Sequence, residues 1–192
     1  MEYRQLGGTG IRASVLGFGM WPIGGTQQLG DYGAVSADDA VAAIHRALDL
    51  GLTLFDTAPA YGNGHAEEIL GRALVGQRDE AVIVTKCAVH WDYDAETWVT
   101  TSNHDDNVSS AEEILRRIGT DQLDVFLIHV PDPSGSPEGS MAAFGELSRP
   151  ARCGRSAFQT SRSNSSRHTA NSGRSKCNRS VATCSTDAAR QP

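Results

Sequence analysis

The sequence contains no apolar run that approaches the roughly 18 residues needed to cross a membrane. It opens without the charged segment and apolar core of a secretory signal peptide, so nothing in it predicts export. Its four cysteines follow no regular spacing, which argues against a disulfide framework and favours a reducing compartment. We therefore expect a cytoplasmic protein with no membrane partner. A hydrophobic content of 39% in 192 residues is typical of one globular domain.

Acidic and basic residues are distributed very unevenly along the chain. Residues 1–147 contain 22 acidic and 8 basic residues, whereas residues 148–192 contain 9 basic residues and a single acid, Asp187. The second segment has 10 serines and no leucine or isoleucine, so it cannot bury enough apolar surface to offset its chain entropy. We therefore divide the chain near Leu147 into a folded part, 1–147, and a basic Ser/Arg-rich tail, 148–192, which we predict to be disordered.

Short apolar runs alternate with helical patterns through the folded part. Four runs are typical of buried strands: SVLGFG, LTLFD, AVIVTK and DVFLIH. The helical patterns that follow them in turn are SADDAVAAIHRALDLG, GHAEEILGRALVG, SSAEEILRRIGT and PEGSMAAFGEL. The opening YRQLGGTGIRAS is typical of a hairpin. This alternation predicts an α/β fold with a parallel sheet and right-handed crossovers.

Both a doubly wound sheet and a barrel fit this alternation, but the strand ends favour the barrel. Three of the four runs end in an ionisable residue, namely Asp56, Lys86 and His129. Barrel enzymes place their chemistry at that end of their strands. The first strand is also not followed by the G-x-G-x-x-G turn of a dinucleotide-binding sheet, which weakens the alternative.

These strand ends and one nearby tyrosine form a constellation suited to proton transfer. Tyr61 lies five residues after Asp56, so a carboxylate, a phenol, an ammonium and an imidazole are expected at one mouth. A phenol has a reference pKa of about 10, and a nearby ammonium would lower that pKa and ease proton donation to a carbonyl oxygen. The carboxylate would hold Lys86 charged, and the imidazole of His129 would hydrogen-bond the substrate oxygen.

Three segments around these residues resemble the aldo-keto reductase family. They are DTAPAYGNGHAEEILGRAL, the TK that contains Lys86, and GTDQLDVFLIHVPDP, which contains His129. The resemblance extends from about Tyr3 to Leu147. It implies a (β/α)8 TIM barrel, of which this chain holds the first four βα units, and NADPH-dependent reduction of a small-molecule aldehyde or ketone, with NADP+ as the oxidised cofactor. It also implies that Tyr61 donates the proton, Lys86 activates it, Asp56 partners Lys86, and His129 orients the carbonyl.

The resemblance also suggests residues that line the cofactor and the substrate. Gly19, Met20 and Trp21 are similar to the family's loop after the first strand. Gly19, Met20 and Asp56 are thereby expected to contact the cofactor, and Trp21 and Val130 to line the substrate pocket. Val130 stands where many members have tryptophan, which predicts a more open wall.

Other functional classes fit parts of the sequence less well. The family resemblance also covers potassium-channel β subunits, so a cofactor-binding regulatory subunit is an alternative. The basic tail has charges for nucleic-acid phosphates but no aromatic platform beyond Phe158 and no folded module, so we expect no specific nucleic-acid partner. We also expect no metal site, because the remaining candidates do not have the spacing of zinc ligands. Those candidates are Cys153, His168, Cys177 and Cys184.

The tail is compatible with a second reading frame that continues the family pattern. The third base of each codon, joined to the first two of the next, can encode AGKVRAVGVSNFSVEQL from Arg149 onward. From Ser175 it can encode EVQSVG and then, after one ambiguous residue, NLFDRR. Both strings resemble the family's fifth and sixth strand segments, in the right order. We therefore expect a frameshift at about Leu147 or Ser148, which sequencing of those codons would test.

Such a chain holds only part of a barrel. A typical TIM barrel takes about 250 residues, so four βα units cannot close one. We expect strands one and four to be left as parallel edges, which would favour self-association. In the family, residues after strands five to eight grip the nicotinamide amide and the adenine end of the cofactor. We therefore predict weak or no NADPH binding by the chain as written.

Overall fold

A parallel sheet forms the centre of the computed structural model, which describes residues 1–25, 33–148, 160–161 and 181–183. The strand order is β3-β4-β5-β8-β10-β9, and every neighbouring pair is parallel. The first four strands are the four predicted from the sequence: β3 (Gly17–Gly19), β4 (Leu54–Asp56), β5 (Val82–Cys87) and β8 (Val125–Ile128). Two short strands, β10 (Val181–Thr183) and β9 (Thr160–Ser161), extend the sheet beyond β8.

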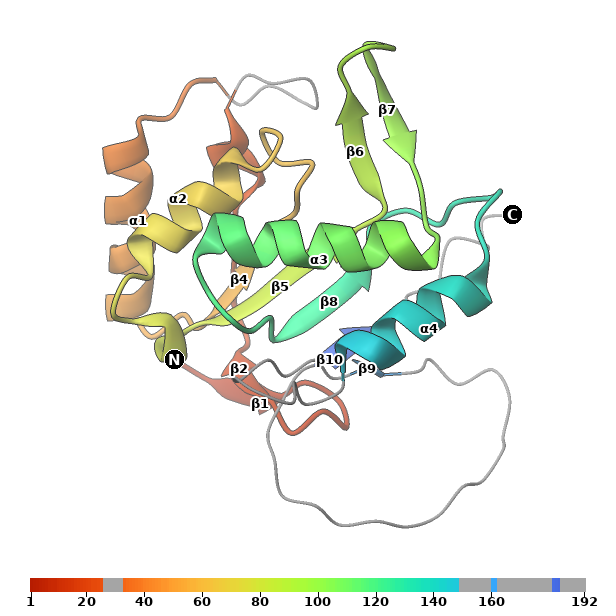
Figure 1. Cartoon of the computed structure of the whole chain (residues 1–192). Helices are drawn as coiled ribbons and strands as arrows, with labels where there is room; N and C mark the ends of the chain where they lie inside the picture. Colours follow the sequence, from red (N-terminus) through yellow and green to blue (C-terminus); the bar gives the residue numbers. More distant parts are fainter. Residues whose placement is uncertain (26–32, 149–159, 162–180, 184–192) are drawn as a thin grey trace, which may run out of the picture.

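Four helices follow one another across one side of this sheet (Figure 1). They are α1 (Ala37–Asp49), α2 (His65–Ala73), α3 (His104–Ile118) and α4 (Pro137–Leu147), and each packs against the next. Strands β3, β4, β5 and β8 are neighbours in chain order with a helix between each pair. A doubly wound sheet would instead carry helices on both faces. The predicted α/β fold of barrel type, with a parallel sheet and alternating helices, is therefore confirmed.

Polar side chains set where the helices begin. The Ser36 hydroxyl accepts a hydrogen bond from the Asp39 backbone N–H at 3.1 Å and caps α1. Helix α3 begins at His104, five residues before the predicted start at Ser109. The reason is Asn103, whose side-chain oxygen accepts from the Asp106 backbone N–H at 2.9 Å.

The main core lies between the sheet and the helices. Along β5, Ile83, Thr85 and Cys87 are buried, while Val82, Val84 and Lys86 on the other face are only partly buried. This alternation is the period of two that a strand imposes on its side chains. The largest fully buried apolar side chains come from both layers: Phe55, Phe126, Phe144, Met20, Ile44, Leu70, Ile83, Ile114 and Leu123.

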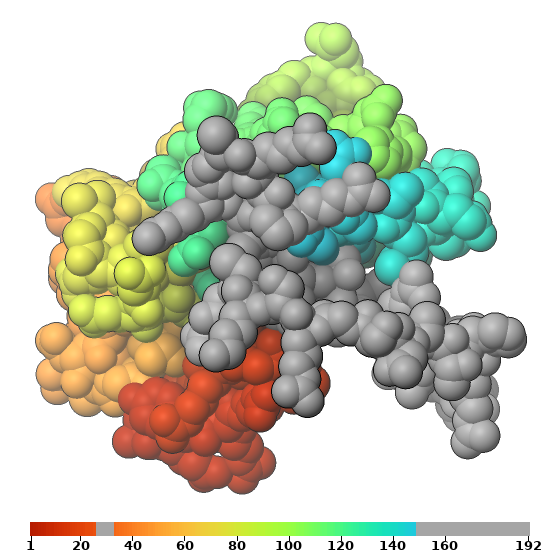
Figure 2. All heavy atoms as spheres, turned by 60° about the horizontal axis from the view of Figure 1, so that its bottom comes forward, coloured from red at the N-terminus to blue at the C-terminus, as the bar shows by residue number. Residues whose placement is uncertain are grey.

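The predicted N-terminal hairpin is present and lies against the starts of the strands. It consists of β1 (Tyr3–Gln5) and β2 (Arg12–Ser14). Ser14 and Thr53 exchange two bonds, each backbone N–H donating to the other residue's hydroxyl, at 3.0 and 2.9 Å. Ile11, in the turn before β2, packs with Val125 at the start of β8. Figure 2 brings this end forward and shows the hairpin in red beside the orange and yellow segments.

A second hairpin projects from the opposite end of β5 and was not predicted (Figure 1). It consists of β6 (Val89–Asp92) and β7 (Thr97–Thr100), with the rings of Trp91 and Trp98 edge to face at 5.4 Å. A pair of 3-10 turns, η1 (Trp21–Gly24) and η2 (Arg78–Glu80), was also missed.

The structure corrects one expectation about the sheet edges. We expected β8 to be an open edge, but β10 pairs with it from Val181 opposite Val125 to Thr183 opposite Leu127. At the other end, β3 has β4 as its one partner strand among the described residues.

Most of the tail, and the four residues considered as zinc ligands, lie outside the described residues. Within the described part, no three His, Cys, Asp or Glu side chains form a group that could hold a metal ion. Of the helices in that part, none is both long and apolar enough to span a bilayer.

Candidate active site

Lys86 connects the residues of the predicted constellation. It projects from β5, and its ammonium donates to Asp56 Oδ1 at 2.8 Å and to the Thr57 carbonyl oxygen at 2.8 Å. The same ammonium lies 3.1 Å from the Tyr61 hydroxyl. The carboxylate at the end of β4 and the phenol in the following loop are therefore held by one positive charge.

Three further groups surround the Tyr61 phenol. Its hydroxyl donates to Asp56 Oδ1 at 3.3 Å. The Trp21 ring is stacked on it, with centroids 5.9 Å apart and planes at 8°, and the His129 ring meets it edge-on at 5.9 Å. The structure thus brings the carboxylate, ammonium, phenol and imidazole together at the carboxyl ends of β4, β5 and β8, with Trp21 beside them.

The pKa of Tyr61 moves in the direction opposite to the one we expected. Burial raises the pKa of the phenol well above its usual value, and the charge and hydrogen bond of Asp56 raise it further. Asp56 pairs with the ammonium of Lys86, so it offsets the positive charge that was expected to favour phenolate. Tyr61 is therefore fully protonated in this resting arrangement.

Burial also governs the two basic groups. It lowers the pKa of Lys86, while the hydrogen bond and charge of Asp56 oppose that change. It lowers the pKa of His129 below the usual value as well, and the charge of Lys86 adds to this effect. His129 is therefore a neutral imidazole at pH 7, able to donate a hydrogen bond from one ring nitrogen.

Besides Asp56, the four residues expected around the cofactor and substrate differ in exposure. Gly19 is exposed, and the half-exposed Trp21 and Val130 lie at the surface. Met20 is fully buried in the main core, and its backbone N–H donates to the Asp56 carbonyl oxygen at 2.9 Å. The structure thus places the Met20 side chain in the core, away from any open surface.

Sequence reasoning missed a pair of glycines that sets the position of Tyr61. A Cβ on Gly24 would lie 2.6 Å from the backbone nitrogen of Gly62 and 2.7 Å from the carbonyl carbon of Tyr61. Gly62 also has a φ of 63°, in the left-handed region that favours glycine. The turn that carries Trp21 can therefore approach the Tyr61 loop only because both positions lack a side chain.

We expect Gly62→Ala to destabilise the fold strongly. The backbone strain costs about 1–3 kcal/mol, and the overlap with Gly24 adds about 1–3 kcal/mol. Gly76→Ala is the matched control, because Gly76 has a φ of 77° but no atom within 4 Å of the added Cβ. Urea unfolding should show a larger loss for Gly62→Ala. Equal losses for the two variants would show that the close approach does not matter.

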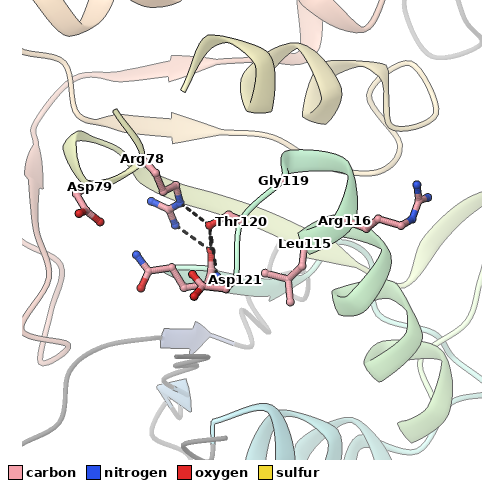
Figure 3. A pocket seen from close by; sticks show the side chains of 8 residues that line it. Arg78, Asp79, Leu115, Arg116, Gly119, Thr120 and Asp121 are labelled. Atoms are coloured by element: carbon pink, nitrogen blue, oxygen red, sulfur yellow. Dashed lines mark hydrogen bonds between the residues drawn. The ribbon is translucent and has the colours of Figure 1, made fainter. Parts of the chain in front are cut away.

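A hollow lies at the other end of the strands. It has a volume of about 700 Å³ and is lined by residues before β5 and β8, including Arg78, Thr120 and Gln122 (Figure 3). The Arg78 guanidinium donates to the Thr120 hydroxyl at 3.1 Å, the Gln122 carbonyl at 3.0 Å and the Asp124 carboxylate at 2.7 Å. These bonds tie two strand starts together, so Arg78 is a structural residue and this hollow is distinct from the candidate active site.

Comparisons with known proteins agree with this geometry. The model of the Aldo/keto reductase family matches residues 15–157. The aldo-keto reductase YhdN of Bacillus subtilis (strain 168) is 41% identical over 149 residues, which are 77% of this chain and 43% of that protein.

Solved structures give the same result. The holo form of aldo-keto reductase AKR11C1 from Bacillus halodurans has a TM-score of 0.67 and 28% identity, and covers 77% of this chain and 46% of its own. An aldo-keto reductase from Klebsiella pneumoniae in complex with NADPH has a TM-score of 0.56 and 28% identity, over 71% of this chain and 42% of its own. The chain thus spans less than half the length of these relatives.

Proposed function

Because the chain belongs to the aldo/keto reductase family, we propose that its tetrad of Asp56, Tyr61, Lys86 and His129 reduces a small aldehyde or ketone with NADPH as the hydride donor. One observation carries this proposal. The Lys86 ammonium lies within hydrogen-bond distance of both Asp56 and the Tyr61 hydroxyl, at 2.8 and 3.1 Å. That arrangement is suited to general acid catalysis on a carbonyl oxygen.

Each member of the tetrad has a separate task in the proposed reaction. Tyr61, whose hydroxyl donates to Asp56 in this structure, turns its proton toward the substrate oxygen and transfers it there. Lys86 stabilises the phenolate that is left behind, and Asp56 keeps Lys86 in place. The neutral His129 donates a hydrogen bond to the same oxygen, which orients the carbonyl and stabilises its developing charge.

The residues beside Asp56 fit a bound nicotinamide cofactor, which supplies a hydride to the carbonyl carbon. Gly19 pairs with Asp56 in the register of β3 and β4, and no atom lies within 4 Å of the place of its missing Cβ. The Asp56 side chain is 43% exposed, so it remains accessible beside this open position. We propose Gly19 and Asp56 as cofactor contacts, and Trp21 and Val130 as walls of the substrate pocket.

The proposal includes the second reading frame, because we expect residues that would complete the cofactor site to be encoded there. We define the frame-restored chain as residues 1–147 followed by the protein of that frame. It is expected to bind NADPH with micromolar affinity in a fluorescence titration and to consume NADPH when a small aldehyde is added. The chain 1–192 is expected to bind more weakly. A frame-restored chain that folds but consumes no NADPH with any of a panel of small aldehydes and ketones would contradict the proposed function.

A further inference from the structure

Glu67 is a buried carboxylate that the proposed mechanism does not use. It lies on α2, in the main core, with no exposed surface. Each of its oxygens has one partner: the Thr85 hydroxyl donates to Oε1 at 2.9 Å, and the Arg117 guanidinium donates to Oε2 at 3.3 Å. A buried charge of this kind is costly unless it is paired and hydrogen-bonded, so its presence requires an explanation.

The first partner leads to the strand that carries Lys86. Thr85 is fully buried on the helix side of β5, and the next residue along the strand is Lys86, which faces the tetrad. The bond from Thr85 to Glu67 therefore fixes β5 against α2 one residue from the ammonium. Burial lowers the pKa of the Lys86 ammonium and Asp56 opposes that change; the negative charge of Glu67 makes a smaller contribution in the same direction as Asp56.

The second partner leads to the loop that carries Tyr61. Arg117, near the end of α3, has a side chain only 15% exposed. It packs beneath Gly64, where a Cβ would lie 2.6 Å from the Arg117 Nε atom. Gly64 is the N-cap residue of α2 and closes the loop after Tyr61. Arg117 has a further acidic partner in Glu113, at 2.7 Å on the same helix, but Glu113 is half-exposed.

We propose that Glu67 is a positioning residue for the tetrad. It holds the Lys86 strand through Thr85 and the Tyr61 loop through Arg117, and its negative charge acts on the Lys86 ammonium. This inference rests on the proposed function for the meaning of the tetrad. Its physical content is a coupling between Glu67 and Lys86 that exists without substrate or cofactor.

Whether Glu67 carries a negative charge at pH 7, and so acts on Lys86, depends on its hydrogen-bond partners. Burial raises the pKa of Glu67 to about 7, while the hydrogen bond from Thr85 and the charge of Arg117 oppose the rise and the charge of Glu113 adds slightly to it. Removing Arg117 would raise the pKa of Glu67 further and leave it neutral at pH 7. The negative charge of Glu67 would then no longer act on Lys86, just as in Glu67→Gln.

The chain is well suited to a direct test, because it contains two lysines, Lys86 and Lys176. Labelling lysine with ¹³C at Cε gives two NMR signals to follow through a pH titration of the full chain, and Lys176→Arg assigns them. We expect Glu67→Gln to shift the Lys86 titration to lower pH. Glu113→Gln is the matched control, because it removes an acid that also pairs with Arg117 but does not act on Lys86.

Arg117→Gln provides a second, independent variant in case Glu67→Gln fails to fold. It too should shift the Lys86 titration to lower pH, over the pH range in which Glu67 is neutral. Arg117→Lys should restore the wild-type curve. A Lys86 titration in a folded Glu67→Gln or Arg117→Gln variant that overlays the wild type would overturn the inference. The readout needs neither NADPH nor aldehyde, so absence of reductase activity would contradict the proposed function alone.

Discussion

Replacing Tyr61 with phenylalanine is expected to lower kcat for aldehyde reduction by the frame-restored chain about 10²–10⁴-fold, the usual contribution of a general acid. Phenylalanine keeps the ring that Trp21 stacks on and that His129 meets edge-on, and it removes only the hydroxyl. NADPH affinity should therefore change little, and the loss should appear in kcat. Steady-state rates of NADPH consumption at saturating aldehyde, together with an NADPH titration, measure both quantities.

Tyr3→Phe is the matched control for this prediction. It removes the same hydroxyl from a tyrosine at the opposite end of the strands, where the group donates to the Gly51 carbonyl at 3.0 Å. We expect kcat to be unchanged in this variant. A Tyr61→Phe enzyme with nearly wild-type kcat would exclude Tyr61 as the proton donor.

The second large effect concerns stability and pH. The pKa of Glu67 is raised from 4.5 to about 7 on folding, so folding favours its protonated form. The stabilisation is fully present below pH 4.5 and is lost as the pH rises through about 7. This difference in pKa between the unfolded and folded states corresponds to about 3 kcal/mol of folding free energy. The wild type should therefore lose about 3 kcal/mol relative to Glu67→Gln between pH 4 and pH 8.

The comparison with Glu67→Gln is needed because other groups also titrate in this range. Paired carboxylates such as Asp56 and Asp124 are the same in both chains, so their contributions cancel in the difference. Urea unfolding of both chains at several pH values measures this difference in the free energy of unfolding. Parallel stability profiles for the two chains would show that Glu67 has an ordinary pKa in the folded state.

The sequence alone predicted the fold well where local patterns decide the structure. The runs that end at Asp56 and Lys86 and the run before His129 are strands, and the helical pattern that starts at Ser36 is a helix. The strand ends also predicted which side chains would meet, because parallel strands deliver their carboxyl ends to one edge of the sheet.

The parts that sequence reasoning missed depend on contacts between distant residues. The β6–β7 hairpin is held by a pair of tryptophans across its strands, and its alternation was too short to distinguish from a loop. Gly24 and Gly62 are 38 positions apart in the numbering, and only their packing shows why both must lack a side chain. Glu67 and Arg117 are separated by 50 residues.

The direction of the Tyr61 pKa was wrong for a related reason. From the residue types alone, we predicted that an ammonium beside a phenol would lower the pKa of the phenol. The structure shows that the same Asp56 oxygen accepts from both Lys86 and Tyr61, at 2.8 and 3.3 Å, and that the phenol is half-buried. Burial and the carboxylate therefore outweigh the ammonium, a balance that depends on distances.

The most direct test of the central claim is to follow the transferred hydride itself. The frame-restored chain is incubated with a small aldehyde and NADPH that carries deuterium at both hydrogen positions of the nicotinamide C4, and the alcohol is analysed by mass spectrometry. We predict that the alcohol carries deuterium on the former carbonyl carbon, and that Tyr61→Phe nearly abolishes its formation. An absence of labelled alcohol from a folded frame-restored chain, across the aldehyde panel, would contradict the assignment of this tetrad to carbonyl reduction.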